Sequence, residues 1–113
     1  MEKDPQIFLG HILDSIALIE KRIENVTLEE FVASIDLQDM INRRLEIIGE
    51  AVKKLPESFK EKNSNIPWAK AMATRNILIH NYTGIKLEIV WDTIKISLPE
   101  FKKQIEELDK PQK

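Results

Sequence analysis

A regular spacing of large aliphatic residues in the middle of the chain most constrains its fold. Between Asp36 and Leu55 these residues recur every three or four positions, at Ile41, Leu45, Ile48, Val52 and Leu55. This spacing places all five on one face of an α-helix. Pro56 ends the pattern, because a proline disfavours the helical conformation of the residue before it. The sequence therefore predicts a long helix over about Asp36 to Leu55 with one buried face.

A second stripe of the same kind lies near the N-terminus. Between Pro5 and Glu24 the apolar positions with helical spacing are Phe8, Ile12, Ile16, Ile19 and Ile23. Pro5 suits a first helical turn, where its missing N–H is not needed. Thr27 and Glu30 then have the spacing of a capping box, in which each side chain accepts from the backbone amide of the other. We expect a helix over this stretch and, after Thr27, a short helix that carries Phe31.

The segment after Pro56 is charged and predicts a connection with one helical turn around Phe59. A further helix is expected to begin near Pro67, to run toward Tyr82 and to end at Gly84, the residue best suited to a left-handed helix end.

The last third of the chain carries another apolar stripe, formed by Leu87, Val90, Trp91, Ile94, Leu98, Phe101, Ile105 and Leu108. The sequence Ser97-Leu98-Pro99-Glu100 interrupts it. A serine and a glutamate at this spacing could cap a new helix, whereas Pro99 could instead kink one continuous helix. Both alternatives predict helix on either side.

Composition agrees with a helical globular chain. Of 113 residues, 42% are hydrophobic, 32% are charged and three are glycine, a balance that argues against disorder. The length suits a single domain over residues 1–113, and small helical domains often complete their core by dimerising. We therefore expect a single all-α domain.

The sequence also bears on location and cofactors. It has no cysteine, which excludes disulfides and thiolate zinc sites and fits a reducing compartment. The N-terminus lacks the order of a signal peptide, and no apolar run approaches the roughly 20 residues of a membrane span. No metal-binding motif and no glycine-rich phosphate loop is present. We expect a cytoplasmic protein with no membrane segment, no metal and no cofactor.

Residues 75–82 gather the polar side chains best suited to chemistry. They include Arg75, Asn76, His80 and Tyr82, the last being the only tyrosine in the sequence. The arginine fork matches phosphate oxygens, and histidine exchanges protons near neutral pH. This combination predicts chemistry at a phosphodiester. The other histidine, His11, has no such neighbours and is expected to be structural or exposed.

The pattern R-x4-H-x-Y within Thr74 to Tyr82 resembles the signature of the HEPN superfamily, in particular its HepT-like ribonuclease toxins. The likeness extends over about residues 4–108 and includes three further segments, Arg44-Leu45-Glu46-Ile47-Ile48-Gly49-Glu50-Ala51, Ile66-Pro67-Trp68 and Leu87-Glu88-Ile89-Val90-Trp91. The resemblance implies an all-α, HEPN-like up-and-down helical bundle, completed as a homodimer, that acts as a metal-independent endoribonuclease. It implies Arg75 and His80 as catalytic residues, with Asn76 and Tyr82 in supporting or substrate-binding roles.

Helical geometry raises a question about this site. On a straight α-helix Arg75 and His80 point about 140° apart, at ~100° per residue. Either the helix loosens around His80, or two copies of the chain share one site across a two-fold axis. The resemblance favours the shared site, because HEPN ribonucleases line one cleft with the motifs of both protomers.

The resemblance also implies a protein partner. HepT-like toxins are typically paired with a nucleotidyltransferase antitoxin of the MNT type, which attaches AMP to the motif tyrosine, here Tyr82. An attached nucleotide would add bulk and negative charge beside Arg75 and His80, as phosphorylation does. The expected partners are thus an RNA substrate, this antitoxin and a second copy of the chain.

The net charge of the chain also leaves other functions possible. The formal charge is −2, whereas nucleic-acid binders usually have a basic excess. The pairs Arg43-Arg44, Lys53-Lys54 and Lys102-Lys103 could form a basic face or could be ordinary solvated charges. The alternative function is a catalytically silent helical dimer that binds a nucleotidyltransferase and a nucleotide or small ligand. A plain helical dimerisation domain is a third possibility.

Overall fold

All regular secondary structure in the described residues is helical. The computed structural model describes residues 4–73 and 87–109. Its elements are α1 (Pro5–Ile23), α2 (Leu28–Ala33), α3 (Ile35–Lys54), α4 (Glu57–Lys62), α6 (Leu87–Asp92), η1 (Thr93–Ser97) and α7 (Leu98–Asp109). Residues 68–73 are also helical. The predicted all-α fold is confirmed.

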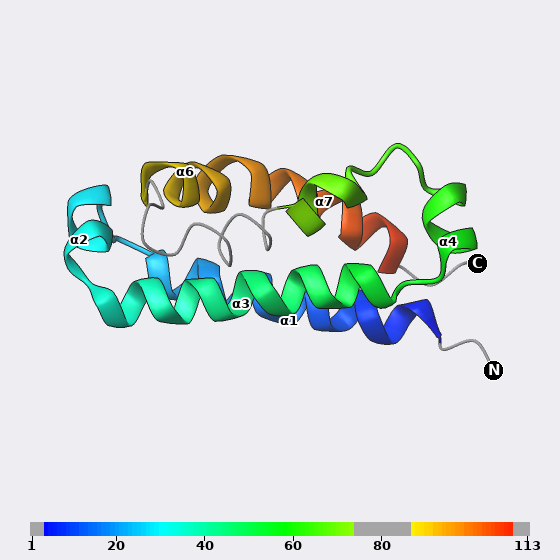
Figure 1. Ribbon diagram of the computed structural model, residues 1–113, viewed down its shortest axis with the longest axis horizontal. Coiled ribbons are helices and arrows are strands. Elements are labelled where there is room, and N and C mark those ends of the chain that lie inside the picture. Colours follow the sequence, from blue (N-terminus) through cyan, green and yellow to red (C-terminus); the bar gives the residue numbers. More distant parts are fainter. Residues whose placement is uncertain (1–3, 74–86, 110–113) are drawn as a thin grey trace.

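The two long helices α1 and α3 lie side by side and run in opposite directions (Figure 1). The segment formed by α6, η1 and α7 lies along them, and α7 packs on α1. At one end of the bundle α2 contacts α6. At the other end the side-chain amide of Gln6 donates to the carbonyl of Leu108 at 3.2 Å, so the start of α1 meets the end of α7. The arrangement is that of an up-and-down helical bundle.

The predicted buried faces form the core. All ten stripe positions of the first and second predicted long helices are buried, and Ile12, Ile16, Ile19, Ile41 and Val52 have no exposed surface. Burial of a side chain of this size contributes about 1.5–3 kcal/mol relative to exposure. The association of α1 with α3 is therefore the main source of hydrophobic stabilisation among the described helices.

The helix ends differ from the predicted ends by one residue. The first helix ends at Ile23 rather than Glu24, and α3 covers Ile35–Lys54 rather than Asp36 to Leu55. Its start is set by Ser34, whose hydroxyl accepts from the amide of Leu37 at 3.2 Å. Its end is set by Pro56, because Leu55 takes the extended conformation that a following proline favours.

The short helix α2 begins with the predicted capping box. The hydroxyl of Thr27 accepts from the amide of Glu30 at 3.1 Å, and the carboxylate of Glu30 accepts from the amide of Thr27 at 3.0 Å. The other end of α2 is closed by Gln38, whose side-chain amide donates to the carbonyls of Phe31 and Val32. Both ends of this six-residue helix are thus satisfied by side chains, and Phe31 is fully buried.

A buried lysine joins α3 to α4. The ammonium of Lys60 lies 3.2 Å from the carbonyl oxygen of Val52 and 3.2 Å from a carboxylate oxygen of Glu57. Only 10% of the Lys60 side chain is exposed. A cation at this position interacts favourably with the negative end of the α3 dipole. Lys60 therefore fixes the turn after α3, where the chain leads on to Trp68.

We predict that Lys60→Met, which keeps the aliphatic stem and removes the ammonium, lowers the free energy of unfolding by about 1–2 kcal/mol. The loss is limited because the Val52 carbonyl also accepts from the amide of Leu55. Urea unfolding measures the change. The control is Lys62→Met, which removes an exposed ammonium from the same helix and should have an effect within about 0.5 kcal/mol. Equal losses in the two variants would contradict this role.

Candidate functional site

The predicted site residues Arg75, Asn76, His80 and Tyr82 lie outside the described residues, as does most of the helix predicted to carry them. The described structure gives the scaffold on both sides of this segment. Residues 68–73 precede it and α6 follows it. The geometry of these two flanks determines where the chain enters and leaves the motif.

The flank before the motif is anchored by Trp68. Its side chain is 7% exposed, and its indole N–H donates to the carbonyl of Asn63 at 3.1 Å. The ring centroid lies 6.3 Å from that of Phe59 and 6.2 Å from that of Phe101, with the latter pair edge to face. Such aromatic contacts add to the effect of simple burial. Trp68 thus packs in the core and ties residues 68–73 to α7.

The flank after the motif is anchored by a second tryptophan. The ring of Trp91 in α6 lies 5.3 Å from the ring of Phe31 in α2, and the neighbouring Val90 is buried. The ammonium of Lys95 lies 5.5 Å from the centre of the Trp91 ring, within the range of a cation–π contact. Trp91 therefore also packs on the core, and both flanks of the motif are held by aromatic contacts.

A π-helical turn follows α6. The amide of Leu98 donates to the carbonyl of Thr93, five residues earlier, and the residues on either side remain helical. The chain is therefore one continuous helix here, and no separate cap forms at Ser97. The buried residues Val90, Ile94 and Leu98 are each four apart, which exceeds the ~3.6 residues of an α-turn. The wider turn keeps all three facing the core just before Pro99.

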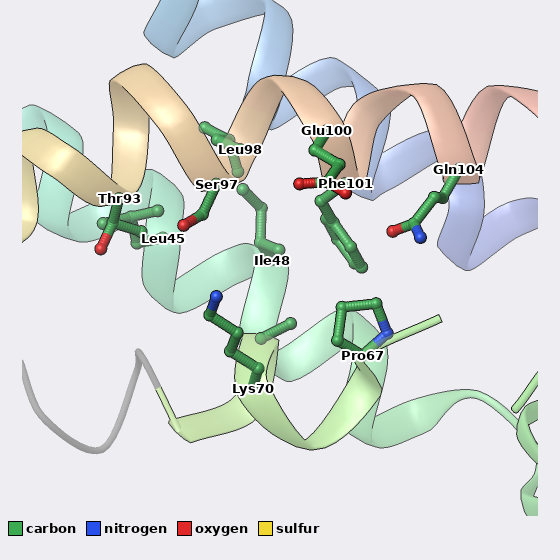
Figure 2. Close-up of a pocket in the computed structure, with 11 residues that line it drawn as sticks. Leu45, Ile48, Pro67, Lys70, Thr93, Ser97, Leu98, Glu100, Phe101 and Gln104 are labelled. Carbon is green, nitrogen blue, oxygen red and sulfur yellow. The ribbon is translucent and has the colours of Figure 1, made fainter. Parts of the chain in front are cut away.

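A cavity of about 230 Å³ lies between α3, residues 68–73, η1 and α7 (Figure 2). The described residues that line it are Leu45, Ile48, Pro67, Lys70, Ala71, Thr93, Ser97, Leu98, Glu100, Phe101 and Gln104. The ring of Phe101 extends from α7 toward Pro67, and Ile48 points into the space from α3 (Figure 2). Sequence reasoning missed this site, because its walls come from segments up to 59 positions apart (45 to 104).

Of the basic pairs singled out in the sequence, two lie on α3 and the third lies on α7. Arg43 is exposed and lies 4.0 Å from Glu46 one turn away. Lys53 and Lys54 are exposed in the last turn of α3, where cations suit the helix dipole. Lys102 donates to the carboxylate of Glu20 at 2.8 Å.

The contact with Glu20 raises the pKa of Lys102 above its ordinary value of 10.5, through the hydrogen bond first and the charge attraction second. Because the folded-state pKa is the higher one, the pair stabilises the fold below the ordinary lysine pKa. That contribution is lost as the pH rises through the raised pKa. The pair thus links α1 to α7 throughout the neutral range.

His11 is exposed on α1, and its ring centroid lies 6.3 Å from that of Phe8 in a T-shaped arrangement, in agreement with a structural or exposed role. Within residues 4–73 and 87–109, no group of three His, Cys, Asp or Glu side chains could hold a metal ion. None of the helices in the described part of the chain is long and apolar enough to cross a membrane.

Fold and sequence together define a class of protein: a small all-α bundle in which an R-x4-H-x-Y segment lies between two flanks fixed to the core by tryptophans. The family model described as "Ribonuclease HepT-like" matches residues 12–108. The chain therefore belongs to the HepT-like ribonuclease family, as the resemblance implied. No solved structure shows a significant match.

Three curated relatives illustrate the similarity. "Gamma-glutamylcyclotransferase and putative RNase MJ0434" of Methanocaldococcus jannaschii is 46% identical over 97% of this chain, which spans 51% of that relative's length. "Putative RNase TTE0752" of Caldanaerobacter subterraneus is 42% identical, with 94% of this chain and 95% of the relative covered. "Probable ribonuclease HepT" of Thermococcus cleftensis is 36% identical, with 97% and 100% covered. The same module thus occurs both alone and as half of a longer protein.

We predict that Trp68→Phe, which keeps an aromatic ring but removes the indole N–H, lowers the free energy of unfolding by about 1–2 kcal/mol. The carbonyl of Asn63 would lose a partly buried hydrogen bond, and the smaller ring would fill less of the core. Thermal unfolding provides the measurement. The exposed neighbour Asn65, changed to Ala, serves as the control and should stay near the wild-type value. Unchanged stability of Trp68→Phe would contradict the anchoring role.

Proposed function

We propose that this chain is a single-domain, metal-independent endoribonuclease that acts as the toxin of a toxin–antitoxin pair. The observation that carries the proposal is the intact R-x4-H-x-Y motif in a chain matched to the HepT-like ribonuclease family over residues 12–108. Arg75 and His80 are the proposed catalytic residues. Asn76 orients His80 or holds a phosphate oxygen, and Tyr82 contacts the substrate.

The residue types suit RNA cleavage without a metal. The 2′-oxygen of the ribose attacks the adjacent phosphorus as its proton passes to a neutral histidine, and the P–O5′ bond breaks as a protonated histidine gives a proton to the leaving oxygen. The arginine neutralises the extra charge of the phosphorane between these two events. The products are a 2′,3′-cyclic phosphate and a free 5′-hydroxyl. No oxidant, metal or nucleotide cofactor enters this sequence.

A homodimer supplies both histidines. A single motif carries one histidine, whereas the two proton transfers use one neutral and one protonated imidazole. Two motifs that face each other across a two-fold axis would provide the pair. They would also remove the conflict between the directions of Arg75 and His80 on one straight helix, which are about 140° apart. The resemblance to HEPN ribonucleases, which line one cleft with the motifs of both protomers, implies the same arrangement.

The proposed antitoxin is an MNT-type nucleotidyltransferase that attaches AMP to Tyr82. The nucleotide would occupy space needed by RNA and place phosphate charge beside Arg75 and His80. Because Tyr82 is the only tyrosine of the sequence, it carries the only phenolic hydroxyl to which AMP could be attached. Neutralisation would then be covalent.

One observation favours a second function. The net charge of −2 is unusual for a nucleic-acid enzyme and suits a catalytically silent dimer that binds a nucleotidyltransferase together with a nucleotide or small ligand. In that case the polar motif residues would serve as binding groups. A folded, unmodified dimer that cleaves no RNA would favour this function over the ribonuclease.

We predict that the purified, unmodified protein cleaves total RNA or a tRNA pool in excess EDTA. Arg75→Ala and His80→Ala should each lower the rate at least a hundredfold, because general acid–base catalysis and electrostatic stabilisation each contribute factors of about 10²–10⁴. Gel analysis of labelled RNA measures the rates, and the ends of the products are tested for a cyclic phosphate. The matched control is His11→Ala, which removes the exposed histidine of α1 and should cleave like wild type. Cleavage by His80→Ala at the wild-type rate would contradict the proposal.

We predict that Tyr82→Phe retains at least a tenth of the wild-type cleavage rate, because the ring that contacts the substrate remains, but escapes neutralisation by the nucleotidyltransferase. The readouts are the mass of the protein after incubation with the transferase and ATP, and bacterial growth when both proteins are expressed together. Wild type should gain one or more AMP groups and become harmless. If the Tyr82→Phe variant were modified to the same extent, AMP would be attached to a residue other than Tyr82.

A further inference from the structure

The cavity between α3, residues 68–73, η1 and α7 combines a buried floor with an open rim. Its floor is apolar and consists of Leu45, Ile48, Leu98 and Phe101, all buried. Its rim includes side chains exposed to solvent, those of Pro67, Lys70 and Glu100. The cavity therefore opens to the surface, so a group from outside can reach the apolar floor.

The volume limits what can enter. An engineered protein cavity of about 150 Å³ holds a benzene molecule, and complete small-molecule ligands usually occupy about 300–1,000 Å³. At about 230 Å³, the space suits a single planar ring system that belongs to a larger ligand. A nucleobase of an RNA strand is such a group.

The polar groups at the edge of the cavity can form hydrogen bonds with the edge of a nucleobase. Ser97 and Thr93 offer hydroxyl oxygens, and the Thr93 hydroxyl already donates to the carbonyl of Ile89 at 2.8 Å, which leaves its lone pairs as acceptors. Gln104 offers both a donor and an acceptor, and the carboxylate of Glu100 only accepts. An apolar surface for the ring and hydrogen-bonding groups for its edge are what recognition of unpaired bases requires.

The cavity adjoins the segment that carries the motif. Lys70 and Ala71 line it, Ala73 is the last described residue before the motif, and Arg75 follows two positions later in the sequence. Figure 2 shows the Lys70 amine directed from this helix toward the side of the cavity formed by η1. A base in the cavity would therefore contact the helical segment that leads directly into the motif in the sequence.

We propose that this cavity receives one unpaired nucleobase of the RNA next to the cleaved bond and selects for bases with an exocyclic amino group. The inference rests on the proposed ribonuclease function and extends it to substrate choice. The selection follows from Glu100, because a carboxylate accepts a hydrogen bond from an amino group such as N4 of cytosine. Uracil has no such group and presents a carbonyl oxygen there, which the carboxylate repels.

The first test fills the cavity. Ala71→Leu adds three carbon atoms at its wall, and Ala69→Leu makes the same change on an exposed position of the same helix. With oligoribonucleotides that differ in one base near the cleavage site, wild type should cleave cytosine-containing substrates at least tenfold faster than uracil-containing ones. Ala71→Leu should raise KM at least tenfold and reduce this preference. Ala69→Leu should match wild type, and unchanged preference in Ala71→Leu overturns the inference.

A second variant tests the selection of the base without introducing a larger side chain into the protein. Glu100 is exposed, so Glu100→Gln should fold normally. Its amide can donate to the uracil carbonyl, so cleavage of the uracil substrate should rise relative to cytosine by at least threefold. No change in the ratio overturns the role of Glu100 in selection.

Binding measured without cleavage separates this inference from the proposed function. Titration of CMP and UMP, followed by NMR, should shift the amide signals of Ala71 and Ser97 with CMP more strongly than with UMP. Nucleotide binding by a protein that cleaves no RNA would retain the base site and reject the ribonuclease. Cleavage without these shifts would reject the base site alone. Loss of dimers in Ala71→Leu, measured by sedimentation, would instead assign the cavity to a contact between copies and overturn the inference.

Discussion

The apolar face of α3 supports the rest of the described chain. It packs on α1 along the length of the bundle, and two of its residues, Leu45 and Ile48, also form part of the cavity floor. At its end the carbonyl of Val52 binds the buried ammonium of Lys60 and so directs the chain into α4. Because protein interiors are close-packed, α3 cannot shift without moving these contacts. The stability of the core and the shape of the cavity therefore depend on the same helix face.

The sequence predicted those parts of the fold whose causes are local. The stripe containing Ile41 and Ile48 has a helical period, and the start of α2 follows from the capping box of Thr27 and Glu30. The sequence alone could not distinguish the π-turn from a cap or a kink. The π-turn depends on how the buried residues before and after Pro99 pack against the core. The cavity depends on contacts between segments distant in sequence. Of the site, the sequence provided residue types and a family likeness, whereas the mutual placement of Arg75 and His80 stays a prediction.

Net charge is a poor guide to the potential near the motif. Several carboxylates are occupied locally: Glu20 by Lys102, Glu57 by Lys60, and Glu46 more loosely by Arg43. An ion pair has little field at a distance of a Debye length, roughly 8–10 Å at physiological salt. The potential that attracts RNA is set by charges close to the site rather than by the sum over the chain. An overall charge of −2 is therefore compatible with a cleft that binds phosphates.

The two tryptophan anchors suggest how one scaffold could serve varied ribonucleases. Trp68 contacts Phe101 before the motif, and Trp91 contacts Phe31 after it, so both flanks are fixed by contacts that do not involve the motif residues. Fixed flanks lower the conformational entropy that the intervening segment must lose on ordering. If the polar groups around the cavity choose the base while the motif performs the chemistry, the two functions occupy separate residues. Changes at Glu100 or Gln104 could then alter the RNA that is recognised without altering Arg75 or His80.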